Sequence, residues 1–575
     1  MKVIHLLSVS ALLTLFGCAN QTQPTGGPKD KTPPVLLRSI PEDRQTNINP
    51  KEISLEFDEL IKLKNAKEQI LITPRVVQEY EITSKRNRVY IKFKEPLNDS
   101  TTYTLNFREG IQDLTEGNIP SDLQLAFSTG PYLDSLSIQG DVKVLFTNKP
   151  AKDISILLYN SNDTLSILNG PPVYLTKTTD KGHYELSNLK SGAYDLYALS
   201  DKNKNLMAEV KSEAYGFYPE AIKLDSSISK INIEIQNLDI SPLKKLSARQ
   251  SGTTFEAKYN KFITDYKIET HDSLPLHSNF VDETHKSIQI YNPLNIQDSL
   301  QIYLTVNDSI NNNQTDTIYL KFEPTLRSPR NFTMDVKLDK IFVTDGLLNG
   351  QLTFNKTITQ TNGDSIFIYL DSLNIFHFDS THLKWNKTKD QLTFNYKIDP
   401  TLLTTSSSTS SSNKPPSPGT KPPLVKENVE KETKTTAPAD KSPQLYIGYS
   451  TFVSAENDSS ALKTTNLSFT KPELFGIILV EIQTDQTSYS VQLLDSKNNV
   501  VQSVESIPKF NFNKVSPGDY RIRVLVDANN NGLWDPGNIL TNTPSEPVIF
   551  YQSTEGNQTL TIRANWELGP NLIQF

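Results

Sequence analysis

The feature that most limits the fold of this chain is a strict alternation of apolar and polar residues in short stretches. Clear examples are "EISLEF" (52–57), "RVYIKF" (88–93), "TYTLNF" (102–107) and "LQLAFST" (123–129). Such alternation predicts half-buried strands that place one face on a core and the other in water. Because similar stretches recur along 575 residues, with Gly, Pro and Asn between them, we expect an all-β chain of several β-sandwiches.

The composition excludes several kinds of site. Cys18 is the single cysteine, so internal disulfides and cysteine-based zinc or iron–sulfur sites are excluded. The formal net charge is -7, and no run of basic residues stands out, so no nucleic-acid partner is expected. Stability must therefore come from apolar area buried in several cores.

Residues 1–17 have the form of a secretory signal peptide. Lys2 is followed by an apolar run from Val3 to Phe16 that is too short to span a membrane comfortably. The segment ends in "LFGC", which resembles the lipobox of bacterial lipoproteins, whose cysteine is acylated and becomes the first mature residue. The resemblance implies lipidation of Cys18, with each buried methylene of the acyl chains contributing about 0.8 kcal/mol. The alternative is an ordinary signal peptide with a chance cysteine.

A tether and an Ig-like domain are expected next. Residues 18–34 are polar, with Pro and Gly, which predicts a flexible tether. Their "PTGGPKDKTPP", and the later "SLEFDELI", "TYTLNFREGIQDLTEGN" and "AFSTG", resemble Bacteroidota lipoproteins with an S-layer-type (SbsA-class) bacterial Ig-like domain. The resemblance implies such a domain at residues 35–130.

Two segments of the chain repeat one another. Residues 184–205 and 510–531 align at a constant offset of 326, which carries position 184 to position 510. The offset pairs Tyr184 with Phe510, Gly192 with Gly518, Tyr194 with Tyr520, Asp201 with Asp527, Asn203 with Asn529, Asn205 with Asn531 and Glu220 with Glu546. Both glycines suit a turn that needs a positive φ. The two blocks resemble transthyretin-like sandwiches, as in carboxypeptidase regulatory domains, which implies such domains at 131–240 and 473–575.

The neighbouring domain also repeats. The stretches "LTFNKTI", "QLTFNYKI", "QLYIGYS" and "TNLSFTKP" parallel strands of the first Ig-like domain, so we expect a second Ig-like domain at 331–472. Residues 404–441 are rich in Ser, Thr, Pro and Lys, which predicts a disordered insertion inside that domain, or alternatively a linker between domains. Residues 241–330 alternate like strands and predict a β-sandwich of uncertain type.

The sharpest local motif is "DANNNGLWDPGN", residues 527–538. Asp527, Asn529, Asn531 and Asp535 have the alternating oxygen spacing of a calcium loop. The motif is not an EF-hand, because its twelfth position is Asn538 and no helical pattern flanks it. Asx turns that serve only the local backbone are the alternative. The sister loop keeps Asp201, Asn203 and Asn205 but lacks the glycine and the later aspartate.

Sequences typical of catalysis are not found. The chain has no G-x-S-x-G elbow and no H-E-x-x-H pair, and its one cysteine is assigned to lipid. We therefore expect a protein that is not an enzyme and that has no cofactor, calcium apart.

A tripeptide of Asp, then Ser or Thr, then usually an apolar residue recurs along the chain. Examples are centred on Ser135, Ser299 and Ser372. The pattern resembles the O-glycosylation motif of exported Bacteroidota proteins and implies glycans on these serines. Turn chemistry before a strand is the alternative.

These features together predict an outer-membrane lipoprotein held by its lipid anchor. The first hypothesis is a structural or accessory binding component of an envelope complex, with a membrane barrel or an assembly or export machine as partner. The second is a carbohydrate-binding or adhesion protein at the cell surface that uses exposed aromatic residues to bind polysaccharide: Tyr215, Phe217, Tyr218 or Trp534. Whether the chain faces the periplasm or the cell surface stays open.

Overall fold

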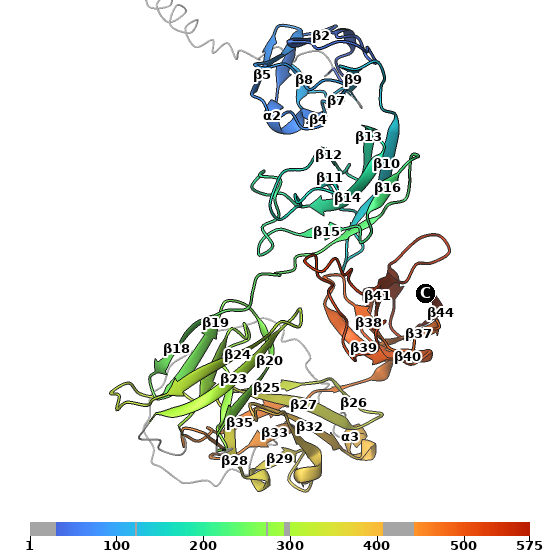
Figure 1. Cartoon of the computed structure of the whole chain (residues 1–575). Coiled ribbons are helices and arrows are strands. Elements are labelled where there is room, and N and C mark those ends of the chain that lie inside the picture. Colours follow the sequence, from blue (N-terminus) through green and yellow to red (C-terminus); the bar gives the residue numbers. More distant parts are fainter. Residues whose placement is uncertain (1–29, 121–122, 272–273, 293–298, 406–441) are drawn as a thin grey trace, which may run out of the picture. The chain divides into compact units, whose positions relative to one another are not determined.

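The computed structural model describes residues 30–120, 123–271, 274–292, 299–405 and 442–575 (Figure 1). Strands form nearly all of its elements, which confirms the all-β fold class. Contacts divide these described residues into two compact units, the first made of those within Met1–Lys143, Pro150–Glu209 and Tyr215–Ile235, and the second of the remaining described residues. No helix in the described part is long and apolar enough to cross a membrane.

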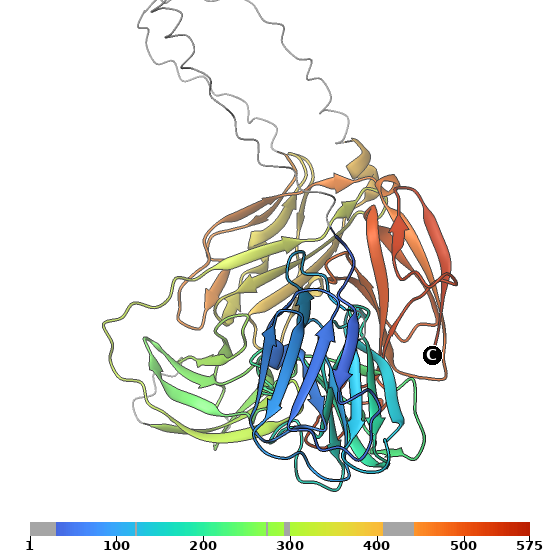
Figure 2. The ribbon, with the colours of Figure 1, turned by 90° about the horizontal axis from the view of Figure 1, so that it is seen from above.

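The first sandwich, called sandwich 1, contains nine strands, drawn in blue in Figures 1 and 2. They are β1 (Leu36–Ile40), β2 (Glu52–Phe57), β3 (Ile61–Leu63), β4 (Leu71–Thr73), β5 (Tyr80–Lys85), β6 (Arg88–Phe93), β7 (Thr102–Asn106), β8 (Ile111–Asp113) and β9 (Gln124–Ser128). The sheets run β1-β2-β6-β5, β3-β8 and β4-β7-β9. The alternating residues Ile53, Leu55 and Phe57 are fully buried in the core, as the sequence pattern predicts.

Sandwich 2 follows in the first unit and has eight strands. They are β10 (Leu136–Val144), β11 (Ser155–Asn160), β12 (Tyr174–Lys177), β13 (His183–Leu189), β14 (Gly192–Leu199), β15 (Tyr215–Phe217), β16 (Ile222–Leu224) and β17 (Ile233–Ile235). One sheet has the order β13-β10-β17 and the other β12-β11-β14-β15, with β16 also paired to β14.

Sandwich 3, drawn in green in Figure 1, begins the second unit. Its strands are β18 (Lys245–Ser251), β19 (Thr254–Tyr259), β20 (Ile263–Thr270), β21 (Ser278–Phe280), β22 (Ser287–Ile290), β23 (Leu300–Asp308) and β24 (Asn313–Leu320). The sheets run β18-β19-β22-β21 and β20-β23-β24. When the strands are lettered in chain order, these are the ABED and CFG sheets of a constant-type immunoglobulin fold.

The strands of sandwich 4 lie before and after the low-complexity segment in the sequence. They are β25 (Met334–Leu338), β26 (Ile341–Phe342), β27 (Leu347–Phe354), β28 (Ile358–Thr361), β29 (Ile366–Tyr369), β30 (Ile375–His377), β31 (Leu383–Trp385), β32 (Gln391–Lys397), β33 (Gln444–Ile447), β34 (Phe452–Ser454), β35 (Lys463–Asn466) and β36 (Phe469–Thr470). Residues 406–441 lie outside the described part. The strand after them, β33, pairs with β29 before them, and Leu403 and Leu445 share one core, so the flanking strands belong to one sandwich.

Sandwich 5 closes the chain with eight strands. They are β37 (Gly476–Gln483), β38 (Tyr489–Leu494), β39 (Val500–Glu505), β40 (Lys509–Val515), β41 (Gly518–Val526), β42 (Val548–Phe550), β43 (Leu560–Ile562) and β44 (Glu567–Gln574). Its sheets run β40-β37-β44 and β39-β38-β41-β42, with β43 also paired to β41. This order repeats that of sandwich 2 strand for strand.

Sandwiches 1 and 4 correspond in most of their strands. The sheet β25-β27-β32-β31 corresponds to β1-β2-β6-β5, the pair β28-β34 to β3-β8, and the part β29-β33-β35 of the sheet β30-β29-β33-β35 to β4-β7-β9. Strand β30 and the pair β26-β36 are additions of sandwich 4. Strand order therefore relates the first two sandwiches to the last two, with sandwich 3 between them in the sequence.

A tyrosine recurs at the same place in sandwiches 2 and 5. The hydroxyl of Tyr194 donates to the carbonyl oxygen of Lys190 at 2.8 Å, and that of Tyr520 donates to Ser516 at 2.9 Å. The expectation of a positive φ at both preceding glycines is confirmed for Gly518, whose φ is 154°, and is wrong for Gly192, although each glycine begins its strand. A Cβ at Gly192 would lie 3.4 Å from the ring of Tyr194, which is ordinary van der Waals contact.

Candidate functional site

The four predicted calcium ligands lie together in the loop that follows β41. Asp527 is buried, and its two carboxylate oxygens accept hydrogen bonds from the backbone N–H groups of Asn531 at 3.0 Å and Gly532 at 2.9 Å. The hydroxyl of Ser488 also donates to Asp527 at 2.7 Å. This hydroxyl bond and the backbone bonds outweigh burial and lower the pKa of Asp527, so the carboxylate is held in its charged form.

Asp535 closes the other side of the loop. Its Oδ2 accepts from the side-chain amides of Asn529 at 2.7 Å and Asn531 at 2.9 Å. Its Oδ1 accepts from the amide of Asn311 in sandwich 3 at 3.1 Å. The structure therefore brings Asp527, Asn529, Asn531 and Asp535 into one hydrogen-bonded loop.

Glu546 belongs to the same loop, although the sequence interpretation did not include it among the ligands. Its Oε1 accepts from the backbone N–H of Asn529 at 3.1 Å, and its Oε2 accepts from that of Asp535 at 2.8 Å. The indole N–H of Trp534 donates to the carbonyl oxygen of Glu546 at 3.0 Å. The sequence feature that could have indicated this role is the position of Glu546, two residues before strand β42, which pairs with β41.

In this geometry the side-chain oxygens of the loop serve N–H donors, as in Asx turns. In the described ranges, no group of three or more His, Cys, Asp or Glu side chains is placed to hold a metal ion. The loop nevertheless presents the carboxylate and amide oxygens that calcium prefers. The calcium site thus stays a prediction, beside the turn interpretation.

The sister loop after β14 makes the same hydrogen bonds. The backbone N–H of Asn205 donates to Asp201 at 3.1 Å and to Asn203 at 3.0 Å, and that of Leu206 donates to Asp201 at 3.1 Å. The amide of Asn203 donates to Glu209 at 2.7 Å, so Glu209 takes the place of Asp535. The sequence pattern does not predict this contact, because a glutamate stands in place of the aspartate of the other loop.

One pair in the constant-offset alignment is wrong. Strand register pairs Leu199 with Tyr215 in sandwich 2 and Leu525 with Val548 in sandwich 5. The residue two positions before each partner strand is Glu213 or Glu546. Glu213, which is 1% exposed, is therefore the counterpart of Glu546, and Glu220 is not. A fixed offset fails here because the loop between β41 and β42 is longer than its counterpart.

The aromatic residues expected to be exposed are mostly covered. Tyr215 lies in β15 and is only 3% exposed, because its strand is paired to β14 and its side chain faces inward. Phe217, Tyr218 and Trp534 are half-buried. The expectation of an exposed ring is therefore wrong for Tyr215, and the other three rings are partly exposed. Tyr303 and Tyr319, on the paired strands β23 and β24, are 41% and 61% exposed instead.

The other predicted sites have simpler surroundings. Ser135, Ser299 and Ser372 are all exposed. Beside Ser372, Asp371 accepts from the backbone N–H groups of Leu373 at 2.8 Å and Asn374 at 2.9 Å, which is an Asx turn. Glycosylation of the three serines stays a prediction. Cys18, the predicted lipidation site, lies outside the described residues.

A cavity of about 630 Å³ lies within the first unit. Charged side chains line it, and several are paired, including Lys204 with Glu68 at 2.6 Å and Lys177 with Asp153 at 3.1 Å. Since these charges neutralise one another, the cavity favours no ligand of one sign.

Comparison with known proteins supports part of this description. Residues 30–129 match the family model of the bacterial Ig-like domain. Sandwich 1 is thus a bacterial Ig-like domain, as the sequence resemblance implies. No curated protein matches the chain.

Several solved structures are similar in part. The N-terminal part of the bacterial S-layer protein SbsC is 14% identical over 36% of this chain and 44% of its own, with a TM-score of 0.13. The chain thus spans less than half of that fragment. The major pilin subunit BcpA of Bacillus cereus is 9% identical over 77% of this chain and 98% of its own, at a TM-score of 0.13. Domains 1–6 of SbsC are 12% identical over 92% of this chain and 68% of that one, at 0.14. Because these TM-scores are very low, we draw nothing from them about function.

Proposed function

We propose that this chain is a non-enzymatic structural and binding protein of the cell envelope. The observation that carries the proposal is the repeated strand order, in which sandwiches 4 and 5 repeat sandwiches 1 and 2. Duplication of whole sandwiches multiplies the loops and sheet faces available to partners, whereas a single catalytic centre gains nothing from it. The bacterial Ig-like domain at residues 30–129 fits the same role.

The finer proposal is an outer-membrane lipoprotein whose acyl chains on Cys18 anchor the sandwiches beside a membrane barrel or an assembly or export machine. It rests on the "LFGC" motif and the polar tether that follows. Sandwiches 2 and 5 are proposed to be transthyretin-like domains.

Metabolic labelling with a fatty acid tests the anchor. The wild-type chain should be labelled and fractionate with membranes, whereas a Cys18→Ser chain should be unlabelled and released. A chemical cross-linker applied to intact envelopes, followed by gentle extraction, should then recover the wild-type chain with a membrane partner. An unlabelled wild-type chain, or a Cys18→Ser chain that stays with membranes, would count against the proposal.

Protease cleavage within residues 404–441 tests which side of the outer membrane the chain faces. Their Ser, Thr, Pro and Lys content makes them good protease substrates. Protease added to intact cells should cut there if the chain faces outside. A cut that appears only after the outer membrane is opened would place the chain in the periplasm.

Carbohydrate binding is the second candidate, and one observation favours it. Tyr303 and Tyr319 expose their rings on one face of sandwich 3, because Tyr319 lies opposite Gln301, two residues from Tyr303. Two neighbouring exposed rings suit stacking against sugar rings. Retention on a polysaccharide column that is lost in Tyr303→Ala with Tyr319→Ala, but kept in Trp534→Ala, would support it.

The loop after β41 is proposed to bind calcium as support for its turn. Isothermal titration calorimetry with calcium should give heat for the wild-type chain and none for Asp527→Asn with Asp535→Asn. Absence of heat for the wild-type chain at millimolar calcium would leave the Asx turns as the whole explanation.

A further inference from the structure

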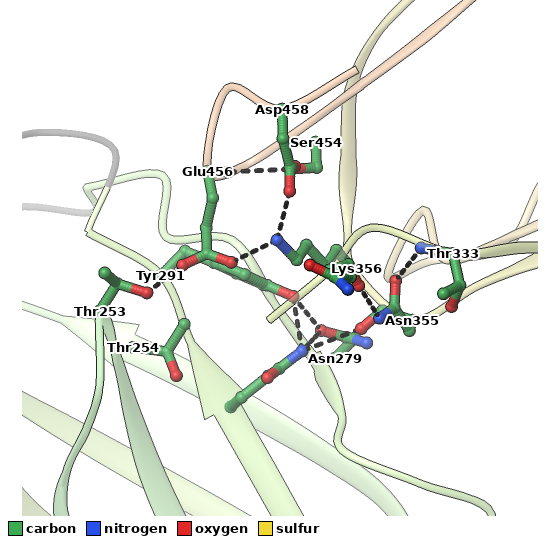
Figure 3. A network of polar contacts seen from close by, with 12 residues as sticks. Thr253, Thr254, Asn279, Tyr291, Thr333, Asn355, Lys356, Ser454, Glu456 and Asp458 are labelled. Carbon is green, nitrogen blue, oxygen red and sulfur yellow. Dashed lines mark hydrogen bonds and ion pairs between the residues drawn. The ribbon is translucent and has the colours of Figure 1, made fainter. Parts of the chain in front are cut away.

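A buried lysine of sandwich 4 lies between two carboxylates (Figure 3). The side chain of Lys356 is only 2% exposed. Its Nζ lies 2.7 Å from Oε2 of Glu456 and 2.5 Å from Oδ2 of Asp458. A lysine amine and two carboxylates therefore meet where little water reaches the amine.

The pairing of β28 with β34 creates this arrangement. Ile358 at the start of β28 lies opposite Ser454 at the end of β34. Lys356 comes two residues before Ile358, and Glu456 comes two residues after Ser454, so antiparallel pairing places them side by side. The backbone N–H of Ala455 donates to the carbonyl oxygen of Thr357 at 2.9 Å and holds the two segments together.

Each carboxylate is also fixed through its other oxygen. The hydroxyl of Thr253, from sandwich 3, donates to Oε1 of Glu456. The hydroxyl of Ser454 donates to Oδ1 of Asp458, and the backbone N–H of Ser454 donates to the carbonyl oxygen of Asp458 at 2.9 Å. These contacts leave the two carboxylates little freedom to turn away from Lys356; Figure 3 shows the side chains that make them.

We propose that Lys356 and Asp458 condense to an intramolecular amide bond. Glu456 accepts a proton from the Lys356 ammonium, and the neutral Nζ attacks Cγ of Asp458, forming the C–N bond. Glu456 returns that proton to the departing carboxylate oxygen, and a second proton from Nζ completes a water molecule as the C–O bond breaks. An ammonium and a carboxylate become one amide and one water, so no oxidant or further reactant is needed.

Position and burial favour this assignment. Reacting groups held in contact reach effective molarities of roughly 10⁵–10⁸ M, which offsets the unfavourable condensation of free ions in water. Glu456 is 10% exposed and suits proton transfer, whereas Asp458 is 34% exposed, so the released water has a way out.

A second buried pair in the same unit provides the contrast. Lys261 lies 2.5 Å from Asp308, and their side chains are 8% and 0% exposed. Asp308 also accepts from the backbone N–H groups of Ile310 at 3.0 Å and Asn312 at 2.9 Å. In the described structure Lys261 pairs with this one carboxylate, so a proton-transfer partner is lacking and the pair stays ionic.

Mass spectrometry of the full chain tests the proposal. After correction for the substitution, the wild-type chain should be lighter than a Glu456→Gln chain by the mass of one water, so that any acyl mass cancels. A tryptic digest of the wild-type chain should contain one branched peptide that joins Lys356 to Asp458. Lys261→Arg should leave the mass loss unchanged, and Lys356→Arg should abolish it.

The digest of the wild-type chain tests the amide bond even if a variant fails to fold. A wild-type digest in which the peptides carrying Lys356 and Asp458 are separate would overturn the proposal, as would a branch at Glu456. Since the envelope proposal is tested by labelling of Cys18, either can fail without the other.

Discussion

Sandwiches 1 and 4 share most of their strand order, but they stabilise the carboxylates at one corner, beside the strand pair β3-β8 or β28-β34, with different polar groups. In sandwich 1, Asp113 ends β8 and accepts from the backbone N–H groups of the next turn, at 2.9 Å for Thr115 and 2.7 Å for Asn118. In sandwich 4, Ser454 ends the equivalent strand β34, and the negative charge moves to Glu456 and Asp458.

The position that faces these carboxylates changes accordingly. Two residues before β3 stands Glu59, and two residues before β28 stands Lys356. Sandwich 1 thus neutralises its buried carboxylate with backbone N–H groups, and sandwich 4 uses a lysine. The comparison shows that strand order is retained while the polar group that stabilises a corner is replaced.

Removal of the lysine should give the largest effect. Lys356→Met removes the proposed amide bond to Asp458 and also the cation that pairs with Glu456 and Asp458 before that bond forms; loss of the buried pair alone costs about 3–5 kcal/mol. Denaturant unfolding of the full chain should show a matching loss in the transition of the second unit. Lys387→Met, which removes an exposed lysine 3.4 Å from Asp265, should cost less than about 1 kcal/mol. Equal effects of the two changes would contradict this interpretation of the corner.

The equivalent change in sandwich 1 should be smaller but clear. Asp113→Ala removes the acceptor of several backbone N–H groups and should lower the melting temperature of the first unit. Burial raises the pKa of Asp113, but the backbone hydrogen bonds outweigh it and lower the pKa overall.

A folded-state pKa below the ordinary value fixes the sign of the pH dependence. The contribution of Asp113 is fully present above the ordinary aspartate pKa and is lost as pH falls through the lowered one. The difference between the wild-type and Asp113→Ala chains should therefore shrink in acid. Glu116→Ala is the control, because its backbone N–H still donates to Asp113. A difference that does not change with pH would mean that the charge of Asp113 is irrelevant.

The sequence predicts the strands better than the polar corners. Alternation identified the half-buried strands β2 and β6, because a period of two follows directly from strand geometry. It was wrong about a solvent face on β7 and β9, which are buried on both faces. It did not identify Lys356, Glu456 and Asp458 as a cluster, since their proximity depends on the pairing of β28 with β34. Glu546 and Glu209 were missed as partners of their loops for similar reasons. One follows a loop of different length, and the other replaces an aspartate by a longer acid.

A smaller effect should separate the two oxygen-rich loops. Gly532 and its counterpart Leu206 both adopt the left-handed region, with φ of 87° and 60°. A side chain in that region costs about 1–2 kcal/mol, so Gly532→Leu should destabilise the second unit by that amount. Leu206→Gly should stabilise the first unit by at most about 1 kcal/mol, because glycine also loses more freedom on folding. The control is Met207→Gly, one position further along, which should destabilise the first unit. If Leu206→Gly and Met207→Gly both stabilised it, the positive φ of Leu206 would not be the cause.

The smallest expected effect returns to the corner of sandwich 1. Burial, and then the charge of Asp113, raises the pKa of Glu59 above its ordinary value. A raised folded-state pKa means that the charged form opposes folding, so the penalty is fully present above the raised pKa and absent below the ordinary one. Glu59→Gln should therefore raise the melting temperature slightly at neutral pH and leave it unchanged in acid. Glu59→Lys, which copies sandwich 4, should do at least as well at neutral pH, since a cation there faces Asp113. A lower melting temperature in both variants would mean that the carboxylate of Glu59 stabilises the corner, and the equivalence of the two corners would then be limited to their strands.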